Sequence, residues 1–514
     1  MKRRKALRAV IGIVLCVAGF LAARANPYRE TTAIIGAGGC RLVTDVVDQG
    51  NDDVRGYVVL FHGLSANKKI MAYLSRGFAS QNLRVFVPDL PGHGRTAGPF
   101  SFERAESCAD TLVQELTARR AIDPRRTILA GHSMGGAIAI RVAARTAVAG
   151  VVAISPAPQR AAHGLPANML PYNNPPPVAA HTLAITGAFE PFGIGESARD
   201  LIAEDATSTS KYLLMPHATH VSVLYDGRVV RAAQEWAAAT LNFPAEFANP
   251  SLAPLVGAFA GLAGILLLAG PFVRETLSMP QTATESGQQA APTVQAPKMV
   301  AATLRIFPAL LEVAVVSFAA VVLLRFWNPL SFVQMYNGSY FGSFLLITGV
   351  MLLALHRKWV RKLGPPQIKT LLSASLAGLV LHLLVTGWLD ATASEAWVSW
   401  ARWARFPVLL VAAFAYLLAE ELLLGPPSGR SKWQRLWLAI TLRAVAFVAL
   451  VFGIFVLHSG AVLLILLALY LAIFFVFQRM GMDLVRRQTG SAIAAALFGA
   501  ILLAGFCLVI FPVT

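Results

Sequence analysis

Charged side chains are scarce in this sequence, and their scarcity excludes an ordinary soluble protein. Only 14% of the 514 residues are charged, whereas 56% are hydrophobic and the mean hydropathy is +0.59. Soluble domains carry about 25% charged residues. The deficit is uneven, because residues 26–250 have an ordinary globular mixture and the chain after Pro250 consists mostly of long apolar runs. We therefore expect two regions of different character.

Cysteine and metal-binding patterns are also sparse. Two of the four cysteines, Cys16 and Cys507, lie in apolar segments. Cys40 and Cys108 lie in the more polar region, where a disulfide is chemically allowed, but their spacing does not show that they meet. The sequence has no cluster with metal-ligand spacing, no phosphate-binding loop and no internal repeat. We therefore expect neither a metal nor a cofactor.

Eight apolar runs follow Pro250, and each is about long enough to cross a ~30 Å hydrocarbon core. They cover residues 254–272, 306–325, 339–356, 370–389, 406–424, 436–457, 460–478 and 491–511. Buried helices of a soluble domain do not explain so many consecutive uncharged runs. We therefore predict a transmembrane domain of about eight helices over residues 251–514, with a flexible Gln-, Ala-, Thr- and Pro-rich linker at 279–298.

The first 25 residues combine a basic cluster with an apolar stretch. They are interpreted either as a signal peptide, with an A-x-A cleavage site at Ala23 and Ala25, or as an uncleaved anchor helix. Both interpretations place the domain over residues 26–250 outside the cytoplasm.

Loop charges favour the same orientation, because Lys and Arg concentrate in loops on the cytoplasmic side. Most of the loop Lys and Arg lie in the loops expected inside, at 273–305, 357–369, 425–435 and 479–490. The loop at 390–405 is the exception, with Arg402 and Arg405 beside Asp390 and Glu395. Because the inner loops explain much of the formal net charge of +17, we expect an integral protein of the plasma or inner membrane, with membrane lipid but no nucleic acid among its partners.

Strand patterns recur at helix-length intervals through residues 26–250. They cover 57–63, 83–90, 126–133, 148–155, 181–187 and 211–216. Alternating strands and helices predict an α/β fold, a doubly wound, mostly parallel sheet covered on both faces. In such sheets the chemistry collects at the carboxyl ends of the strands.

One such end reads LAGHSMGGAIAI, from Leu129 to Ile140. A strand that turns into a helix within a few residues strains the turn residue, and flanking glycines remove the Cβ clashes. Gly131, Ser133 and Gly135 match G-x-S-x-G, the nucleophile-elbow pattern, in the strand–turn–helix context that the pattern requires.

LFHGLSAN, PDLPGHGRTAG, AGHSMGG, ITGAFEP and MPHATH occur in an order and spacing that resemble the α/β-hydrolase-fold serine hydrolases. The resemblance is greatest to the monoacylglycerol lipase and serine aminopeptidase branch and covers residues 55–240. It implies a hydrolase that cleaves ester, lipid-derived or peptide substrates through an acyl-enzyme on Ser133. The family order of serine, acid and histidine makes His220 the base, with His217 as the alternative, and implies structural roles for three further histidines. These are His62, His93 and His132.

The catalytic acid must lie between Ser133 and His220 in the sequence. Glu190 follows LAITGAF in the G-x-x-[D/E]-P arrangement of the relatives, although many of them have Asp here. We therefore predict Glu190 as the acid, with Glu196 next. Three other carboxylates lie in or beside a helical pattern and are interpreted as a solvated helix face. They are Asp200, Glu204 and Asp205.

The developing oxyanion of acyl transfer needs backbone N–H donors. The resemblance assigns them to Met134, directly after the nucleophile, and to Leu64 in the HG-x loop. The segment 156–180 occupies the position of a lid and is interpreted either as a small cap or as a plain connecting loop.

Ionisable residues inside the apolar runs are costly in hydrocarbon and often functional. They are Glu312, His382, Glu420, Glu421 and Arg443. One ion-pair cluster would satisfy all of them except His382. Trp397, Trp400 and Trp403 have the spacing of a helical face suited to the membrane interface.

Two function classes therefore remain. One is a membrane-bound serine hydrolase whose membrane half is an anchor. The other is a transport or lipid-handling protein with an accessory hydrolase-like domain.

Overall fold

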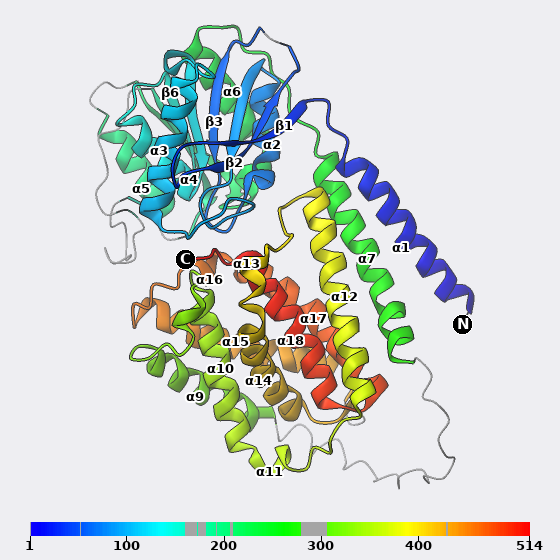
Figure 1. Cartoon of the computed structure of the whole chain (residues 1–514). Coiled ribbons are helices and arrows are strands. Elements are labelled where there is room, and N and C mark those ends of the chain that lie inside the picture. The colour runs from blue at the N-terminus through cyan, green and yellow to red at the C-terminus, as the bar shows by residue number, and fades with distance from the viewer. Residues whose placement is uncertain are drawn as a thin grey trace. The chain divides into compact units, whose positions relative to one another are not determined.

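The computed structural model describes residues 2–51, 53–159, 172, 181–191, 193–205, 209–278, 306–427 and 430–514 (Figure 1). The chain divides into two compact units. The sheet unit comprises Val17–Gly261, Trp388–Trp397 and Pro512–Thr514. The helical unit comprises Met1–Cys16, Leu262–Gly387 and Val398–Phe511. The short segment Trp388–Trp397 therefore packs with the sheet unit, although it lies far along the chain.

An eight-stranded sheet forms the centre of the sheet unit. Its strands are β1 (Arg29–Ile35), β2 (Leu42–Asp48), β3 (Gly56–Phe61), β4 (Leu83–Pro88), β5 (Thr127–His132), β6 (Gly150–Ile154), β7 (Thr182–Phe189) and β8 (Lys211–Thr219). Their order is β1-β2-β4-β3-β5-β6-β7-β8. Strand β2 pairs antiparallel with both β1 and β4, and all other pairs are parallel. The predicted mostly parallel sheet is confirmed.

The six predicted strands correspond to β3 to β8, whereas β1 and β2 were not predicted. Six of the seven residues of β1 are exposed, so its sequence RETTAII shows no alternation of buried and exposed positions. Edge strands of this kind are held by backbone pairing to the neighbouring strand rather than by a buried face. The antiparallel register of β1 on β2, from Arg29 opposite Asp48 to Ile35 opposite Leu42, supplies that pairing.

Two pairs of helices pack against the sheet. Helices α2 (Ala72–Ala79) and α6 (Gly227–Leu241) contact each other, as do α3 (Phe102–Ala118) and α4 (Met134–Ala143) (Figure 1). Buried residues of α2 and α6 share one core cluster with alternate residues of β3 to β7. Helix α5 (Ile194–Ala203) lies against β7 and β8. The layered arrangement leaves the carboxyl ends of β5, β6 and β7 near one another.

A disulfide joins Cys40 to Cys108 on α3 and settles a pairing that the sequence left open. The bond ties the loop after β1 to a helix 68 residues further along the chain. Disulfides persist in oxidising compartments and are rare in the cytosol.

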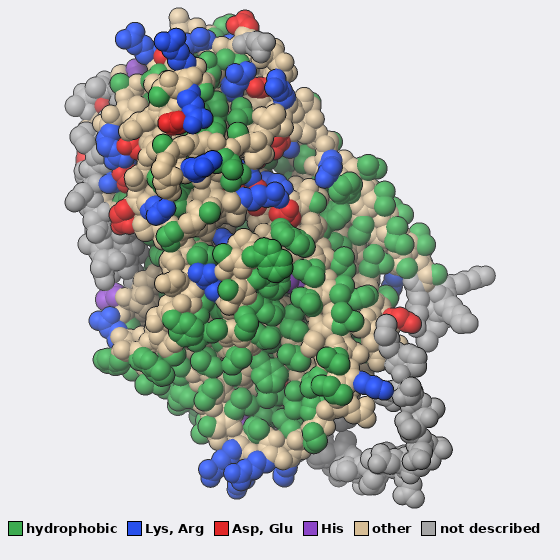
Figure 2. Space-filling view, viewed as in Figure 1, with side chains coloured by type: hydrophobic (Ala, Val, Ile, Leu, Met, Phe, Trp, Pro, Cys, Tyr) green, Lys and Arg blue, Asp and Glu red, His purple; other side chains and the backbone are tan. Residues whose placement is uncertain are grey.

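Among the described residues, nine helices are long and apolar enough to cross a membrane. The first is the apolar part of α1 (Lys2–Ala23). The others are α7 (Ala253–Leu277), α9 (Ile306–Leu324), α10 (Gly338–Leu355), α12 (Ile368–Thr392), α14 (Phe406–Leu424), α15 (Lys432–Phe455), α17 (Ala468–Thr489) and α18 (Ala492–Ile510). Hydrophobic side chains cover much of the helical unit's visible face, which is typical of a lipid-facing surface (Figure 2). The linker predicted at 279–298 lies outside the described residues.

The predicted run 460–478 is displaced in the structure. Helix α17 begins at Ala468 and ends at Thr489, so the loop predicted at 479–490 is helical. Its polar residues Gln478, Arg479 and Asp483 are buried rather than in an aqueous loop. Buried charges require partners, and these residues find theirs on neighbouring helices.

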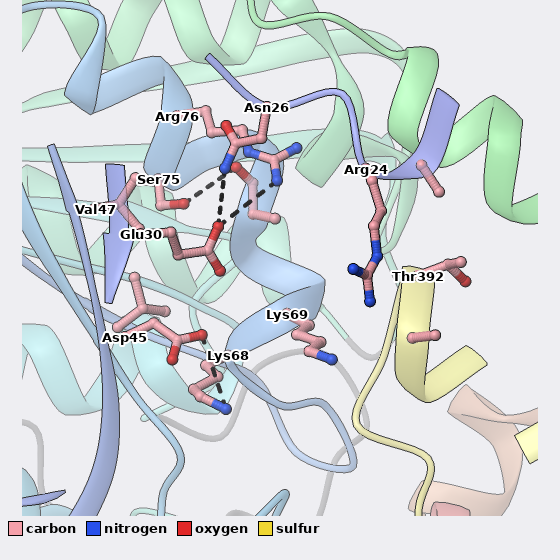
Figure 3. A pocket seen from close by; sticks show the side chains of 14 residues that line it. Arg24, Asn26, Glu30, Asp45, Val47, Lys68, Lys69, Ser75, Arg76 and Thr392 are labelled. Carbon is pink, nitrogen blue, oxygen red and sulfur yellow. Dashed lines mark hydrogen bonds and ion pairs between the residues drawn. The ribbon is translucent and has the colours of Figure 1, made fainter. Parts of the chain in front are cut away.

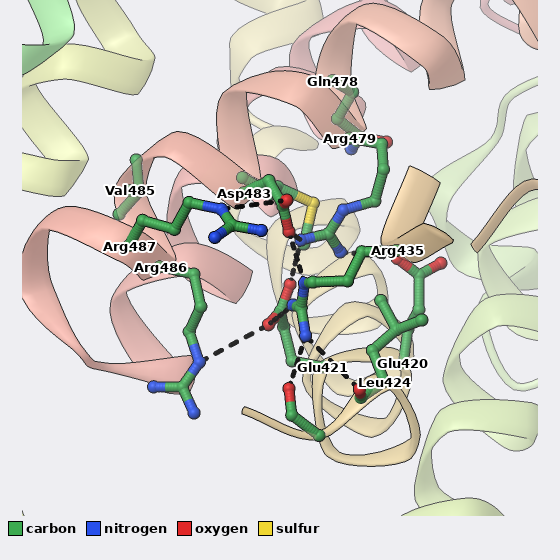
Figure 4. A network of polar contacts seen from close by, with 12 residues as sticks. Glu420, Glu421, Leu424, Arg435, Gln478, Arg479, Asp483, Val485, Arg486 and Arg487 are labelled. Carbon is green, nitrogen blue, oxygen red and sulfur yellow. Dashed lines mark hydrogen bonds and ion pairs between the residues drawn. The ribbon is translucent and has the colours of Figure 1, made fainter. Parts of the chain in front are cut away.

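Those partners form an ionic network between α14, α15 and α17 (Figure 4). It consists of Glu420, Glu421, Arg435, Arg443, Arg479 and Asp483, all buried. The Arg443 Nε–Glu420 Oε2 distance is 2.6 Å, and Arg435 Nε lies 2.7 Å from Asp483 Oδ1. Arg479 contacts both glutamates and Asp483. Glu312 does not join the network, because it pairs with His356 at 2.8 Å, so the single cluster expected from the sequence is wrong for that residue.

The three tryptophans do not lie on one helix, because Trp397 precedes helix α13. Helix α13 covers only Trp400–Trp403, and Trp400 is 88% exposed. Trp403 instead packs edge-on against the buried ring of His382, with ring centroids 5.9 Å apart. The mid-helix histidine is therefore enclosed by an aromatic neighbour.

Candidate active site

Ser133 stands at a sharp turn between β5 and α4. Its backbone has φ 55° and ψ −118°, a conformation that a non-glycine residue rarely adopts. A Cβ on Gly131 would lie 2.2 Å from the Gly135 carbonyl oxygen, and one on Gly135 would lie 2.2 Å from the Phe61 carbonyl oxygen. Both positions therefore require glycine, and the strain at Ser133 is retained because its neighbours fix the turn.

The structure brings Ser133, His220 and Glu190 together in one hydrogen-bonded chain. Ser133 Oγ lies 3.0 Å from His220 Nε2, and His220 Nδ1 lies 2.7 Å from Glu190 Oε2. The three residues follow β5, β8 and β7, so they come from three different strand ends. The arrangement provides a hydroxyl, a base that can take its proton, and a carboxylate that orients the base.

Glu190 is held by more than the histidine. Its second oxygen, Oε1, accepts hydrogen bonds from Ser155 Oγ at 2.5 Å and from the Gly187 N–H at 3.1 Å. Burial alone would raise the pKa of Glu190, but the hydrogen bond and charge of His220, with Ser155 and the Gly187 N–H, keep the pKa below its ordinary value of 4.5. The carboxylate is therefore kept ionised beside the ring.

Ser155 was not identified from the sequence. It follows β6 with φ 44°, and its N–H donates to the Ile185 carbonyl oxygen at 2.7 Å. The only signal in the sequence is its place at the end of a predicted strand. A serine that orients the acid leaves no pattern of its own.

The proposed oxyanion donors lie on the two segments beside Ser133. Met134 is the first residue of α4, where helix N–H groups lack intrahelical acceptors. Leu64 belongs to the loop after β3, and a Cβ on the preceding Gly63 would approach Ser133 Cβ to 3.1 Å. This loop therefore passes directly against the elbow.

Imidazoles hold the surrounding loops by bonding to the backbone. His62 Nε2 accepts from the Leu90 N–H at 2.9 Å, and His93 Nε2 accepts from the Ser65 N–H at 3.2 Å. His132 Nε2 donates to the His220 carbonyl oxygen at 2.7 Å. Burial lowers the pKa of His132 to about 3 and that of His62 to about 4, so both rings stay neutral.

The alternative residues lie elsewhere. His217 is exposed on β8 with φ 62°. Glu196 lies in the first turn of α5, and Asp200 lies on the same helix. Most of the predicted cap, 156–180, lies outside the described residues. Among the described residues, no group of three or more His, Cys, Asp or Glu has an arrangement that would hold a metal.

A buried ion cluster beside the Leu64 loop was missed by sequence reasoning. Lys68 Nζ donates to Glu395, which belongs to the segment Trp388–Trp397, and faces Asp89 at 3.4 Å and Asp45 at 3.8 Å. Asn67 also bonds this segment, donating from Nδ2 to Ser394 Oγ at 3.0 Å. The loop that carries Leu64 is thus fastened to residues more than 300 positions away in sequence.

The Glu395 carboxyl has an unusual environment. Burial and the neighbouring Asp89 raise the pKa of Glu395 to about 7, although Lys68 opposes the shift. Arg95 Nε lies 3.3 Å from Glu395, and Arg95 Nη2 lies 3.0 Å from Asp390 in the same segment. Glu395 and Asp390 of this segment therefore pair with two cations from the N-terminal part of the chain, Lys68 and Arg95.

Comparisons with known proteins find similarity to part of the chain. Residues 52–191 match the family model of the serine aminopeptidases (S33). A stretch of 121 residues is 36% identical to the monoacylglycerol lipase of Mycolicibacterium smegmatis, covering 23% of this chain and 42% of that protein. A stretch of 90 residues is 32% identical to the pimeloyl-(acyl-carrier protein) methyl ester esterase of Nitrosospira multiformis, covering 17% of this chain and 33% of that protein. The chain spans less than half the length of these curated relatives.

Two solved structures are similar to part of the chain. An esterase from Thermogutta terrifontis covers 41% of this chain and 99% of its own, at 17% identity and a TM-score of 0.33. An esterase from Pyrobaculum calidifontis covers 47% of this chain and 93% of its own, at 16% identity and a TM-score of 0.35.

Proposed function

Starting from an N-terminal α/β-hydrolase domain of the esterase and lipase type, we propose that this chain is a membrane-bound serine hydrolase with Ser133 as its nucleophile. The observation that carries the proposal is the hydrogen-bonded chain from Ser133 Oγ through His220 to Glu190, on a strained glycine-flanked turn. A serine hydroxyl is a poor nucleophile until an adjacent base removes its proton, and His220 stands within reach.

The proposed reaction has two steps, acylation of Ser133 and hydrolysis of the acyl-enzyme. Ser133 Oγ attacks the carbonyl carbon of the substrate while His220 Nε2 takes the hydroxyl proton, and Glu190 stabilises the resulting imidazolium. The Met134 and Leu64 N–H groups receive the negative charge on the carbonyl oxygen. The tetrahedral intermediate then expels the alcohol, which takes the proton from His220 and leaves an acyl group on Ser133. Water attacks the acyl carbon by the same route and releases the acid.

Esters are the proposed substrates. The matched stretches of the monoacylglycerol lipase and the methyl ester esterase favour an ester, and the apolar helices favour a lipid-derived one. Amide hydrolysis is the second candidate, because the matching family model is that of the serine aminopeptidases. The transport or lipid-handling alternative receives less support, because Ser133, His220 and Glu190 are all present and in contact.

An extracytoplasmic position for the sheet unit belongs to the same proposal. Lys and Arg concentrate at 357–369, which is expected inside, and the Cys40–Cys108 disulfide favours an oxidising compartment.

Hydrolysis of a short-chain p-nitrophenyl ester by the full chain in detergent tests the activity. The Ser133→Ala variant should fold and insert but lose kcat by about 10⁴-fold or more, because removal of the nucleophile leaves only binding and the oxyanion donors. Ser107→Ala, an exposed serine on α3, is the matched control and should hydrolyse like wild type. Undiminished hydrolysis by Ser133→Ala would refute the proposal, and a parallel aminoacyl amide assay distinguishes the two substrate classes.

A further inference from the structure

A cavity in the sheet unit lies at the ends of two apolar helices, and the proposed reaction does not use it. Its volume is about 330 Å³. Ala23, at the end of α1, and Ala391 and Thr392, at the end of α12, line it together with side chains from β1, β2 and α2 (Figure 3). Both helices are long and apolar enough to cross a membrane. If both cross it, the cavity lies at the level of the lipid headgroups.

The cavity wall has an excess of positive charge. Four cationic side chains line it, against two carboxylates, Glu30 and Asp45, which leaves a formal excess of two positive charges. The cations are Arg24, Lys68, Lys69 and Arg76.

Both carboxylates already have partners. Glu30 lies 3.8 Å from Arg76, and Asp45 accepts from Thr32 Oγ1 at 2.6 Å and faces Lys68 at 3.8 Å. Arg24 and Lys69 are therefore the cations whose charge these carboxylates do not offset.

These cations have N–H donors that could bond an anionic ligand in the cavity. The Arg24 guanidinium lies over the ring of Phe20, 4.7 Å from its centroid. Lys69 Nζ donates to the Asp390 carbonyl oxygen, which leaves two of its three protons for other acceptors. Within the described part of the chain, Arg76 Nε is buried and lacks a hydrogen-bond partner. In Figure 3, Arg24 and Lys69 extend toward the same open region of the cavity.

We propose that this cavity binds the phosphate group of a membrane phospholipid. A phosphodiester supplies a negative charge and strong acceptor oxygens, which suit an arginine fork and a lysine ammonium. The acyl chains would extend beside the apolar helices α1 and α12, whose last turns form the cavity wall. We prefer a phospholipid to free phosphate because the phosphate group would contact the cationic wall and the acyl chains would contact the adjoining apolar helices.

The site is independent of ester hydrolysis. Its lining residues include none of Ser133, Glu190 or His220, so the lipid held here is a bound partner rather than the molecule cleaved. Failure of this proposal would leave the proposed hydrolase function intact, and the converse also holds.

Lipid retention by the full chain, measured by native mass spectrometry after delipidation and addition of one defined lipid, tests the site. The probes are phosphatidylglycerol, phosphatidylethanolamine and diacylglycerol, the last of which lacks phosphate. Wild type should retain both phospholipids and release diacylglycerol. Arg24→Ala combined with Lys69→Ala should weaken phospholipid retention by about thirtyfold, because each surface cation contributes about a factor of five.

Arg125→Ala combined with Lys211→Ala is the matched control, since it removes one exposed arginine and one exposed lysine of the sheet unit that do not line the cavity, and it should retain lipid like wild type. Arg24→Lys combined with Lys69→Arg should restore most of the retention, which separates lost binding from misfolding. Equal retention of diacylglycerol, or undiminished phospholipid retention by the double alanine variant, would overturn the proposal. Competition by millimolar inorganic phosphate with no preference for phospholipid would identify free phosphate as the ligand and overturn the lipid assignment.

Discussion

Buried ionisable side chains occur in both units, but their balance differs. In the helical unit, three buried carboxylates face three buried guanidinium groups, and the less buried Arg486 and Arg487 add further contacts to Glu421 and Asp483. At the Ser133 site of the sheet unit, the carboxylate of Glu190 bonds the ring of His220, and the chain of contacts ends at the Ser133 hydroxyl. The first arrangement has no proton to move, because arginine is always protonated. The second is suited to moving one.

The comparison shows that buried charge inside an apolar helix does not by itself mark a functional site. Ion pairs that are fully matched cost desolvation energy but satisfy one another, whereas a site that does chemistry leaves one group able to change its protonation state. By this criterion we expect the Glu420–Arg443 network to hold helices together and the Ser133 site to carry out the proposed reaction.

The largest expected effect would come from removing the charge of Glu190. Glu190→Gln keeps the side-chain size but no longer holds the reactive tautomer of His220, so kcat should fall by about 10⁴-fold while the protein stays folded. Labelling of Ser133 by a fluorophosphonate should become slow but remain detectable, because the nucleophile and oxyanion donors survive. Glu196→Gln is the control, and loss of turnover in that variant alone would show that the acid is misassigned.

Removal of one arginine from the ionic network should affect stability rather than turnover. Arg479→Met leaves an unmatched carboxylate charge in a buried position, which should lower the free energy of unfolding by about 3–5 kcal/mol. Thermal unfolding of the full chain in detergent measures it. Arg487→Met on the same helix removes a partly exposed partner of Asp483 at 3.6 Å and should cost under about 1 kcal/mol. An Arg479→Met variant that unfolds like wild type but no longer hydrolyses ester would contradict the structural role of the ionic network.

Local patterns in the sequence were sufficient for most of the sheet and for the proposed catalytic residues. Strands β3 to β8 alternate with helices, and the Ser133 turn carries a strict glycine pattern. Strand β1 was not predicted because its side chains are exposed. The polar half of α17 resembled a loop because the partners of its buried charges lie on other helices. Ser155, Lys68 and Glu395 could not be assigned roles, since each depends on a contact between distant segments.

The smallest expected effect concerns Glu395, whose pKa of about 7 exceeds the ordinary 4.5. Between about pH 5 and 7 the folded chain holds a proton that the unfolded chain has lost, so this group's contribution to stability decreases as pH rises and levels off above pH 7. The charged groups that face it are Lys68, Asp89, Asp45 and Arg95, with Asp390 on its own segment.

Melting temperatures of the full chain at pH 5, 6, 7 and 8 measure this contribution. Glu395→Gln should reduce the decline from pH 5 to 7 by a few degrees relative to wild type. Glu246→Gln, which removes an exposed carboxylate, is the control and should follow the wild-type profile. Identical profiles for wild type and Glu395→Gln would contradict the assigned titration.

The central claim is that Ser133 is the residue that forms the covalent intermediate. Peptide mapping by mass spectrometry after reaction of the full chain with a fluorophosphonate locates that residue directly. We expect a phosphonyl adduct on the peptide that contains Ser133, at near-stoichiometric yield, together with parallel loss of ester hydrolysis. Loss of hydrolysis with the adduct on another residue, or continued hydrolysis after Ser133 is fully modified, would contradict it.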